Sequence, residues 1–586
     1  MKGLLAGIGL LALLVSTTYI KEEALVDNES MGYPSASHQS FYDLPSFYEG
    51  IEQEGYVDKI SNPVYGGIVS HHLLTRKSIA QFFAEFRSQP VETVVLIGPN
   101  HYSVGAPKAS ITLKDFDTPY GIISVDSAVA SSLIESGLVA LEEKPFRNEH
   151  SISALTPYIK YNFPEAKIVP IVLHYSTSRI QLDGLVEQLL QSLPKNSIVV
   201  ASVDFSHHLN RIATEFHDVS SVSAIEQFDF DRIFNLEIDS PPSIYTVLSY
   251  MSEVGAQNIS HESLNSTDFT GNLGTEDATS YVFAHFSDGM LQETPTEATS
   301  LHFGDMMFDR AIKEEMTKGE DPFEYIKGVE GNFLRGVDVT VGNLEGVISD
   351  AEDCQEEKEV VMQFDSSAAG LLEKYNFSAM NLANNHSNDC FEQGLLDTEK
   401  ILSEKSIDVI GSELSDGYIV KDVGTKSIAI VGVNEVSRFE DDFHETLDLI
   451  ETLSKEHDSM VVHVHWGYEY DTKASSLQKE VAYQLVDAGA EVIIGHHPHV
   501  IQEVEQYNGS TIFYSLGNFI FDQTHASTTV GFGVGLVHSE GVQNGVVFPY
   551  TVEGLKPKLM PYEDMKVFCD DFLQEISREG ECGFVQ

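Results

Sequence analysis

The stretch from His463 to Gln502 decides the fold of this chain and reads HVHWGYEYDTKASSLQKEVAYQLVDAGAEVIIGHHPHVIQ. The apolar runs near its two ends predict buried strands, and both runs end in histidines. Between them, apolar residues recur at helical spacing and predict an amphipathic helix: Leu477, Val481, Leu485 and Val486. The stretch therefore predicts a strand–helix–strand unit with metal-ligand side chains at its strand ends, where open α/β sheets bind ligands.

The same alternation of apolar strands and helical segments continues on both sides of this stretch. It predicts α/β domains, and 586 residues are too many for a single core. A short break rich in Thr, Pro and Glu at 289–298 predicts a linker between two domains, over residues 60–288 and 299–567. We expect residues 568–586 to form a C-terminal tail.

The N-terminus, MKGLLAGIGLLALLVSTTYI, has one lysine followed by an apolar run. Residues 1–20 therefore predict either a cleaved signal peptide or a membrane anchor. Both interpretations place the rest of the chain outside the cytoplasm, membrane-anchored or secreted. Residues 21–59 are polar and lack a period, so we expect them to be a linker.

The chain is strongly acidic, with 90 acidic and 35 basic residues and a formal charge of −55. Such a surface repels the phosphates of nucleic acid, so we expect no nucleic-acid partner. Adaptation for solubility or salt explains the charge, and the handling of cations or polyanions is the alternative. The four cysteines have no CxxC spacing and do not predict a zinc knuckle, but Cys569 and Cys582 are a candidate disulfide pair.

In the first domain, histidines recur at the ends of predicted apolar strands. Each one alone is typical of a structural residue, but the repetition of His71, His101 and His207 predicts a shared pocket. The motifs GGIVSHH, LIGPNHY, EHSISALTPYI and SVDFSHH resemble those of the Memo family, also called AmmeMemoRadiSam system protein B. The resemblance covers about residues 60–288.

This resemblance implies a three-layer α/β fold like that of the extradiol dioxygenases. It also implies a pocket, beside Glu149 and His150, that contains His71, His101, Asp204 and His207. Iron in this Memo-like pocket is part of what the resemblance suggests. However, residues 209–288 contain no cysteine, which is a ligand in some relatives, and this weakens the case for copper or redox chemistry.

In the second domain, the predicted strand ends carry carboxylate, amide and imidazole groups without thiolates: Asp305, Asn343, Glu345, Asn385, His386, His465, His497 and His499. This set suits a divalent ion such as Mn, Fe or Zn. Two such ions can clamp a phosphate and activate a bridging water, and we expect His386 to protonate the leaving group. A simple turn at Asn384–Asn385 and a solvated Glu345 are the alternatives. We expect His463 to face away from His465 and to be structural.

The motifs FGDMMFDR, VGNLEG, NLANNHSND, VHWGYEY, GHHPHVIQ and SLGNFIFDQ resemble, in this order, the CapA family of poly-γ-glutamate capsule biosynthesis proteins. That family is similar to calcineurin-like metallophosphoesterases, which implies a four-layer αββα fold over residues 299–567. By position, the resemblance implies that the metal ligands are Asp305, Glu345, Asn385, His465, His497 and His499. It implies catalytic roles for His386 and His465, and supporting or substrate contacts for Asn343, Arg310, His496 and Asn518.

Two departures from the superfamily pattern affect the metal site. Met307 stands where a histidine is usual, and Asn343 stands where a bridging aspartate is usual. We therefore expect Glu345 to supply the bridging carboxylate. One bound ion is the alternative to two.

Together, these motifs predict a metal-dependent phosphoesterase or transferase that acts in the synthesis or export of an anionic surface polymer such as poly-γ-glutamate. The expected partners are this polymer or a phosphoester substrate, polymer synthase subunits, and the membrane through the N-terminal segment. One alternative is a non-catalytic envelope component that binds the polymer or its synthase. Another is a metal-dependent redox function in the Memo-like pocket.

Overall fold

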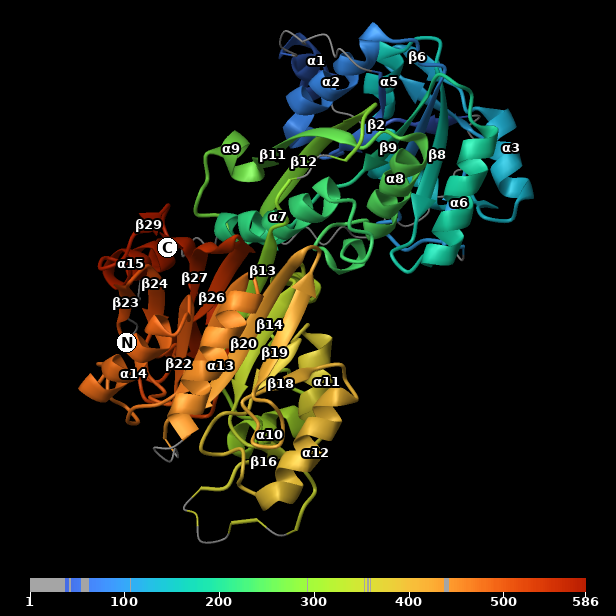
Figure 1. Cartoon of the computed structure of the whole chain (residues 1–586). Coiled ribbons are helices and arrows are strands. Elements are labelled where there is room, and N and C mark those ends of the chain that lie inside the picture. The colour runs from blue at the N-terminus through green and yellow to red at the C-terminus, as the bar shows by residue number, and fades with distance from the viewer. Residues whose placement is uncertain are drawn as a thin grey trace, which may run out of the picture.

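The computed structural model of the chain describes residues 37–41, 44–53, 63–105, 107–291, 294–352, 354–355, 358, 360–436 and 442–586. The expected signal peptide or membrane anchor at 1–20 lies outside these residues. Within the described ranges, no helix combines the length and apolar character that crossing a bilayer requires. Figure 1 shows two α/β parts, an N-terminal one in blue to green and a C-terminal one in yellow to red.

The N-terminal part is built on one nine-stranded sheet, with the order β10-β12-β2-β9-β3-β8-β4-β7 and β11 beside β12. Its central strands β2, β9, β3 and β8 are parallel. The strands of this part, including a small separate sheet of β1, β5 and β6, are β1 (Ser37–Gln39), β2 (Val64–Val69), β3 (Thr93–Pro99), β4 (Ala109–Ile111), β5 (Asp115–Thr118), β6 (Gly121–Ile123), β7 (Ala140–Leu141), β8 (Lys167–Leu173), β9 (Ser197–Ser202), β10 (His207–Leu209), β11 (Asn258–Asn265) and β12 (Ala278–Ser287).

Helices cover both faces of this sheet, so the predicted three-layer α/β architecture is confirmed. Successive side chains of a strand point to opposite faces of the sheet, so each strand contributes to two cores. In β3, Val94 packs in the core beneath α2 and α5, whereas Val95 packs in the core beneath α6 and α8. The helices are α1 (Leu44–Gln53), α2 (Arg76–Glu85), α3 (Ser127–Glu135), α4 (His150–Ser153), α5 (Thr156–Asn162), α6 (Arg179–Ser192), α7 (Arg211–Glu226), α8 (Pro241–Val254) and α9 (Ser266–Thr270).

The segment expected to be a linker, residues 21–59, instead folds onto this part where it is described. Strand β1 pairs in parallel with β5, and α1 packs against α2. The ring of Phe47 is fully buried, 4.8 Å from the ring centroid of Tyr158. This buried aromatic ring anchors α1 to the N-terminal part.

The C-terminal part has a ten-stranded sheet packed face to face on a six-stranded sheet. Val341 and Val534 of the first sheet share a core with Val461 and Ile494 of the second. Helices α13 and α14 cover the outer face of the six-stranded sheet, and α11, α12 and α15 pack on the ten-stranded sheet. The predicted αββα layering is therefore confirmed.

The strands and helices of this part are, in chain order, β13 (Ala298–Met306), α10 (Arg310–Thr317), β14 (Val339–Leu344), β15 (Val347–Ile348), β16 (Gln363–Phe364), α11 (Ser367–Lys374), β17 (Ala379–Asn381), α12 (Phe391–Ser403), β18 (Asp408–Ile410), β19 (Tyr418–Val423), β20 (Lys426–Asn434), α13 (Asp442–Glu456), β21 (Ser459–His465), α14 (Ser476–Asp487), β22 (Val492–His496), β23 (Val504–Tyr507), β24 (Ser510–Phe513), β25 (Asn518–Ile520), β26 (Val530–Ser539), β27 (Gly541–Glu553), β28 (Lys556–Leu559), α15 (Tyr562–Phe572), β29 (Arg578–Glu579) and β30 (Gly583–Val585). The predicted strand–helix–strand unit is β21–α14–β22, with its two strands parallel neighbours.

The expected C-terminal tail, residues 568–586, is instead part of the ten-stranded sheet. Strand β30 pairs with β27, and a disulfide joins Cys569 to Cys582, the pair that the sequence suggested. A second disulfide joins Cys354 to Cys390, which sequence spacing did not indicate. Both bonds hold elements of the C-terminal part together.

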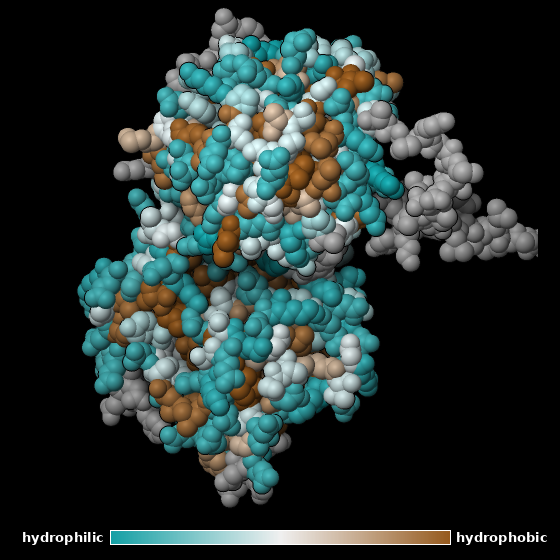
Figure 2. All heavy atoms as spheres, turned by 90° about the vertical axis from the view of Figure 1, so that its right-hand side faces the viewer, coloured by the Kyte–Doolittle hydropathy of each residue, from teal (hydrophilic) through white to brown (hydrophobic). Residues whose placement is uncertain are grey.

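The two parts are packed directly against each other, and α7 lies at their junction in Figure 1. Phe216 of α7 packs on Phe548, with ring centroids 5.6 Å apart. A buried ion pair joins Arg232 to Asp338, with Nε 2.9 Å from Oδ1 and Nη2 3.0 Å from Oδ2. In contrast to this apolar and paired junction, hydrophilic residues cover most of the face drawn in Figure 2, as the acidic composition requires.

Candidate metal centre

Strand register brings the predicted donors of the C-terminal part to one edge of the two sheets. Asp305 pairs with Asn343 of β14 and with Asn518 of β25. In the facing sheet, His465 pairs with His496 at the ends of β21 and β22. Because these strands are parallel, their C-terminal ends place distant parts of the sequence side by side.

The turn after β22 holds its histidines in a conformation that side chains rarely adopt. The backbone φ angle is +95° at His497 and +58° at His499. Left-handed backbone at a residue other than glycine costs free energy and is concentrated at functional sites. The strain is consistent with a turn that is shaped to present both imidazoles.

Asp305, Glu345 and His499 form the innermost group. Their side chains are buried, and one ligand atom of each lies within 4.8 Å of the others. Asp305 Oδ2 lies 3.1 Å from His499 Nδ1, and Glu345 Oε2 lies 3.8 Å from His499 Nε2. Two carboxylates and one imidazole at this spacing can share a divalent cation.

A second group of donors lies on the other side of Glu345. His465 Nε2 is 2.8 Å from Asn385 Oδ1 and 3.8 Å from Glu345 Oε1. The ring of His497 lies 4.8 Å, centroid to centroid, from that of His465. Glu345 thus directs Oε1 toward His465 and Oε2 toward His499, which is the position of a bridging carboxylate.

Asn343 is oriented as a hydrogen-bond donor to these carboxylates. Its Nδ2 lies 2.8 Å from Asp305 Oδ1 and 3.3 Å from Glu345 Oε1. Its Oδ1 accepts from the Nδ2 groups of Asn381, at 2.9 Å, and Asn384, at 3.3 Å. The side-chain oxygen therefore faces away from the donors, and Asn343 supports the site without being placed to ligate.

Asn518 fixes which nitrogen of His499 is available. Asn518 Nδ2 donates to Gln523 Oε1, at 3.0 Å, and to the carbonyl of Thr528, at 3.3 Å. Its Oδ1 therefore accepts from His499 Nδ1, which is 2.9 Å away. In the neutral ring this leaves the Nε2 lone pair, the atom that faces Glu345, as the ligand.

The charges of Asp305 and Glu345 favour the binding of a cation. Burial, with the Asp305 charge second, raises the pKa of Glu345 well above its usual value. Burial opposes the charge of Asp305, but its close contacts with His496 and His499 keep its pKa well below the usual value. Among the described residues, Glu345 Oε2 has no hydrogen-bond partner. A buried carboxylate oxygen without a partner, next to a charged carboxylate, fits a divalent ion.

The imidazoles of the second group are held neutral, as metal ligation requires. Burial lowers the pKa of His465 well below 6.5 and that of His497 to about 4. For His499, burial opposes the charge, but Glu345 and Asp305 raise the pKa to about 9. Since that rise comes from the two carboxylates, a cation placed between them would replace the proton.

His386 is supported by two residues that the sequence analysis missed. Its Nδ1 lies 2.8 Å from Oδ2 of the buried Asp389, and Lys358 Nζ lies 2.5 Å from Asp389 Oδ1. The carbonyl of Asn385 accepts from Lys358 at 2.5 Å. The i,i+3 spacing of His386 and Asp389 was a usable signal. No sequence signal indicated Lys358. It lies in a loop that the Cys354–Cys390 disulfide holds close to His386.

Arg310 and His463 lie outside the two groups of donors. Arg310 lies at the rim, 2.6 Å from Asp522 Oδ1 and 5.6 Å from the ring centroid of Phe521. His463 does not face away from His465, because residues i and i+2 of a strand share a face. It is fully buried between the sheets, where His302 and His496 contact it.

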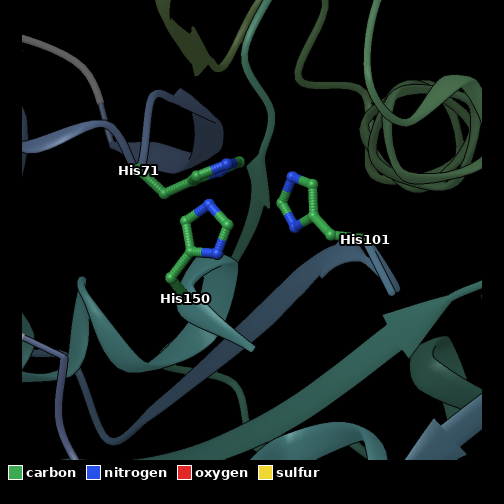
Figure 3. A group of neighbouring side chains, drawn as sticks. All are labelled: His71, His101 and His150. Carbon is green, nitrogen blue, oxygen red and sulfur yellow. The ribbon is translucent and has the colours of Figure 1, made fainter. Parts of the chain in front are cut away.

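The N-terminal part has a second cluster of possible ligands, and Figure 3 shows His71, His101 and His150 turned toward one another. They come from the loops after β2 and β3 and from the start of α4. The ring of His71 lies 5.1 Å from that of His101 and 5.0 Å from that of His150. Their ligand nitrogens can lie around one ion.

Carboxylates complete this second cluster. Asp204 Oδ2 lies 3.6 Å from His71 Nε2, and Asp239 Oδ2 lies 3.5 Å from the Nε2 atoms of both His71 and His101. The sequence analysis missed Asp239, which follows no strand-end motif. His207 lines the two adjoining cavities, of about 440 and 730 Å³.

The charges of this cluster are unevenly distributed. Burial lowers the pKa of His71 to about 3 and raises that of Asp239 to about 7. For His101, burial opposes the charge, but hydrogen bonds to Asp239 and Glu149 raise the pKa to about 10. The cluster thus offers one neutral imidazole and two carboxylates, His71, Asp204 and Asp239, to a cation.

Comparisons with known proteins divide the chain at the same place. Residues 67–260 match the family model "Memo-like protein", and residues 299–523 match "Bacterial capsule synthesis protein PGA_cap". The PGA biosynthesis protein CapA of Bacillus subtilis is 34% identical over 245 residues, which are 38% of this chain and 62% of that protein. A MEMO1 family protein of Desulfurococcus amylolyticus is 28% identical over 223 residues, 36% of this chain and 76% of that protein.

A solved phosphatase of Mycoplasma pneumoniae is 14% identical, with a TM-score of 0.27 over 45% of this chain and 92% of that chain. The chain spans about three fifths of the length of the curated capsule proteins that it matches. The family matches confirm the predicted fusion of a Memo-like part to a CapA-like part.

Proposed function

We propose that this chain, in which a CapA-like part follows a Memo-like part, is a metal-dependent phosphoesterase or transferase that acts in the synthesis or export of an anionic surface polymer such as poly-γ-glutamate. The observation that carries the proposal is the position of Glu345 between two groups of donors. A carboxylate shared in this way suits a pair of divalent ions.

The donor set assigns ligands to two positions. Asp305, Glu345 and His499 would hold one ion, Mn, Fe or Zn, and Glu345, Asn385, His465 and His497 would hold the other. When bound, such ions supply positive charge for the phosphate oxygens and lower the pKa of a coordinated water. Asn343 donates to both carboxylates and so keeps their remaining lone pairs directed at the ions.

The leaving oxygen needs a proton, and we assign its donation to His386. Asp389 accepts from His386 Nδ1 and stabilises the imidazolium form, which then carries its second proton on Nε2. Lys358 Nζ donates to the other oxygen of Asp389, Oδ1. This arrangement gives the proton donor a fixed direction and a charged partner.

We also propose an extracytoplasmic location, either membrane-anchored through residues 1–20 or secreted. The two disulfides support it, because such bonds persist in oxidising compartments. The polymer or a phosphoester would then be the substrate, with polymer synthase subunits as partners. The formal charge of −55 argues against nucleic acid.

The proposal is tested by hydrolysis of bis(p-nitrophenyl) phosphate by the full chain with Mn²⁺. We expect turnover that falls at least about 100-fold in His465→Ala and in Glu345→Gln. His457→Ala, which changes a histidine at the end of α13, is the matched control and should leave the rate unchanged. Tight Mn²⁺ binding without turnover on any phosphoester would favour a non-catalytic, polymer-binding component instead.

The Memo-like pocket supports a second candidate function, an iron site. His71, Asp204 and Asp239 offer one imidazole and two carboxylates around one position, a donor set that suits iron(II). Iron measured in protein from wild type and from His71→Ala tests this. Equal iron in the two proteins would remove the candidate.

A further inference from the structure

A chain of hydrogen-bonded side chains runs through the space between the two sheets of the C-terminal part. It begins at His538 on β26, whose Nε2 lies 2.7 Å from Ser300 Oγ on β13. Ser300 Oγ lies 2.7 Å from His302 Nε2. His302 Nδ1 lies 2.9 Å from Nε2 of His463 on β21 in the facing sheet. These four side chains are fully buried.

The chain ends at the metal centre. His463 Nδ1 lies 3.0 Å from Nε2 of His496, the last residue of β22. His496 Nδ1 in turn lies 3.5 Å from Asp305 Oδ1, an ion-pair distance rather than a hydrogen bond. Five consecutive contacts therefore connect His538 with a carboxylate of the proposed metal site, without any exposed link.

The ionised carboxylate sets the direction of every hydrogen bond in this chain. A neutral imidazole has one donor nitrogen and one acceptor nitrogen. The negative charge of Asp305, 3.5 Å from His496 Nδ1, favours a hydrogen on that nitrogen, so His496 Nε2 accepts from His463 Nδ1. By the same step, His463 Nε2 accepts from His302 Nδ1, and His302 Nε2 accepts from Ser300.

The far end of the chain independently favours the same direction. Ser300 donates its only hydrogen to His302, so it accepts from His538 Nε2, which leaves a lone pair on His538 Nδ1. That nitrogen has no partner among the described residues. Reversing the chain would bury an unpaired N–H there and would point a lone pair at Asp305, and both changes cost free energy. Burial lowers the pKa of His302 and of His538 to about 3, so both are neutral.

We propose that Ser300, His302, His463 and His496 are positioning residues, which together hold Asp305 Oδ1 so that Oδ2 is directed at a divalent cation. Asp305 Oδ1 accepts a hydrogen bond from Asn343 Nδ2 and lies 3.5 Å from His496 Nδ1, whereas Oδ2 faces His499. The proposal rests on the proposed metal-dependent function. A sandwich core of this kind is normally apolar, because buried polar networks stabilise a fold only when every member is satisfied.

Asp305 is held to its ion more firmly while this chain is intact. Residues that hydrogen-bond to a metal ligand typically change metal affinity by about 10- to 100-fold when they are mutated. Ser300 lies three hydrogen bonds away from His496, so we expect about 10-fold from Ser300→Ala. His463→Phe, which interrupts the chain next to His496, should have the larger effect.

The test measures Mn²⁺ binding by calorimetry, and the visible absorption of bound Co²⁺, on the full chain carrying His71→Ala to disable the N-terminal cluster. Thr340→Val is the matched control, because Thr340 is fully buried in the strand beside β13 and its hydroxyl has no partner among the described residues. We expect Ser300→Ala and His463→Phe to weaken Mn²⁺ binding and to shift the Co²⁺ bands. Thr340→Val should do neither.

The Asp305→Ala variant separates the two ways in which the idea can fail. If Asp305→Ala binds Mn²⁺ as tightly as its parent, the proposed metal centre is wrong and the positioning role falls with it. If Asp305→Ala loses Mn²⁺ but Ser300→Ala and His463→Phe match Thr340→Val in affinity and in Co²⁺ absorption, only the positioning role is overturned. Ser300→Ala removes a single hydroxyl and keeps the test valid if His463→Phe does not fold.

Discussion

His386 Nδ1 lies 2.8 Å from Asp389 Oδ2, and the carboxylate of Asp389 is completely buried. A carboxylate in this position selects the tautomer of the ring and stabilises its protonated form. The pair therefore carries the proposed proton transfer, although a catalytic role was predicted from the sequence only for the histidine. The consequences for activity can be measured directly.

We predict that Asp389→Asn lowers kcat for bis(p-nitrophenyl) phosphate by about 100-fold, because an amide cannot stabilise the imidazolium of His386. The measurement is kcat at saturating substrate and Mn²⁺. Asp397→Asn on α12 is the control, since Asp397 bonds Ser349 and Gln393 instead. An unchanged kcat in Asp389→Asn would contradict the assignment.

We predict that Glu345→Gln reduces the metal content of the C-terminal part, because the amide removes the charge that two ions would share. Elemental analysis after loading with Mn²⁺ should show the loss of at least one ion per chain relative to wild type. Glu491→Gln is a matched control, because Glu491 is a partly buried carboxylate that accepts from backbone N–H groups of Met460 and Val542. An equal loss in both variants would argue against a bridging role.

We predict a pH-dependent effect of Glu85, a residue outside both sites. Burial, with Glu262 second, raises its pKa to about 7 from 4.5. The folded state therefore favours the protonated form, and this stability is lost as pH rises from 4.5 through 7. Glu85→Gln should raise Tm at pH 8 and have little effect at pH 5. Calorimetric melting at both values tests this, and an equal shift at both would count against it.

We predict that Cys569→Ser combined with Cys582→Ser lowers the free energy of unfolding by about 2–3 kcal/mol, because the disulfide closes a short loop in the unfolded chain. Urea unfolding measures the change. The metal content should stay at the wild-type value, since this bond lies in the sheet region of β27 and β30. A loss of metal without a loss of stability would be the opposite of the expected result.

We predict that Asp239→Asn lowers iron in the N-terminal cluster about as much as His71→Ala does. Asp239 Oδ2 is 3.5 Å from His71 Nε2, so it is a candidate ligand in its own right. Iron analysis in a Glu345→Gln background isolates this cluster from the C-terminal centre. Asp231→Asn, which alters an exposed partner of Arg179, is the control. Normal iron content in Asp239→Asn would exclude a ligand role.

Much of the molecule follows from local sequence patterns. The spacing of apolar residues between His463 and Gln502 identified β21, α14 and β22, because burial on one face imposes a period that a short window reveals. Donor types at strand ends located Asp305, Glu345 and His465, since parallel strands end at one edge. Helix α1 was not predicted, because its place depends on the contact of Phe47 with Tyr158, which lies far away in the sequence.

By itself, the sequence determined the two α/β parts, the order of their motifs and the kind of ion that the C-terminal donors suit. Only the tertiary structure decided that Glu345 lies between two donor groups, that Asn343 turns its nitrogen inward, and that Asp239 joins His71. It also decided that buried histidines from both sheets connect to Asp305. Periodicity and residue chemistry can be evaluated in a short window of sequence. These contacts depend instead on how the two sheets pack, which no short window of sequence can predict.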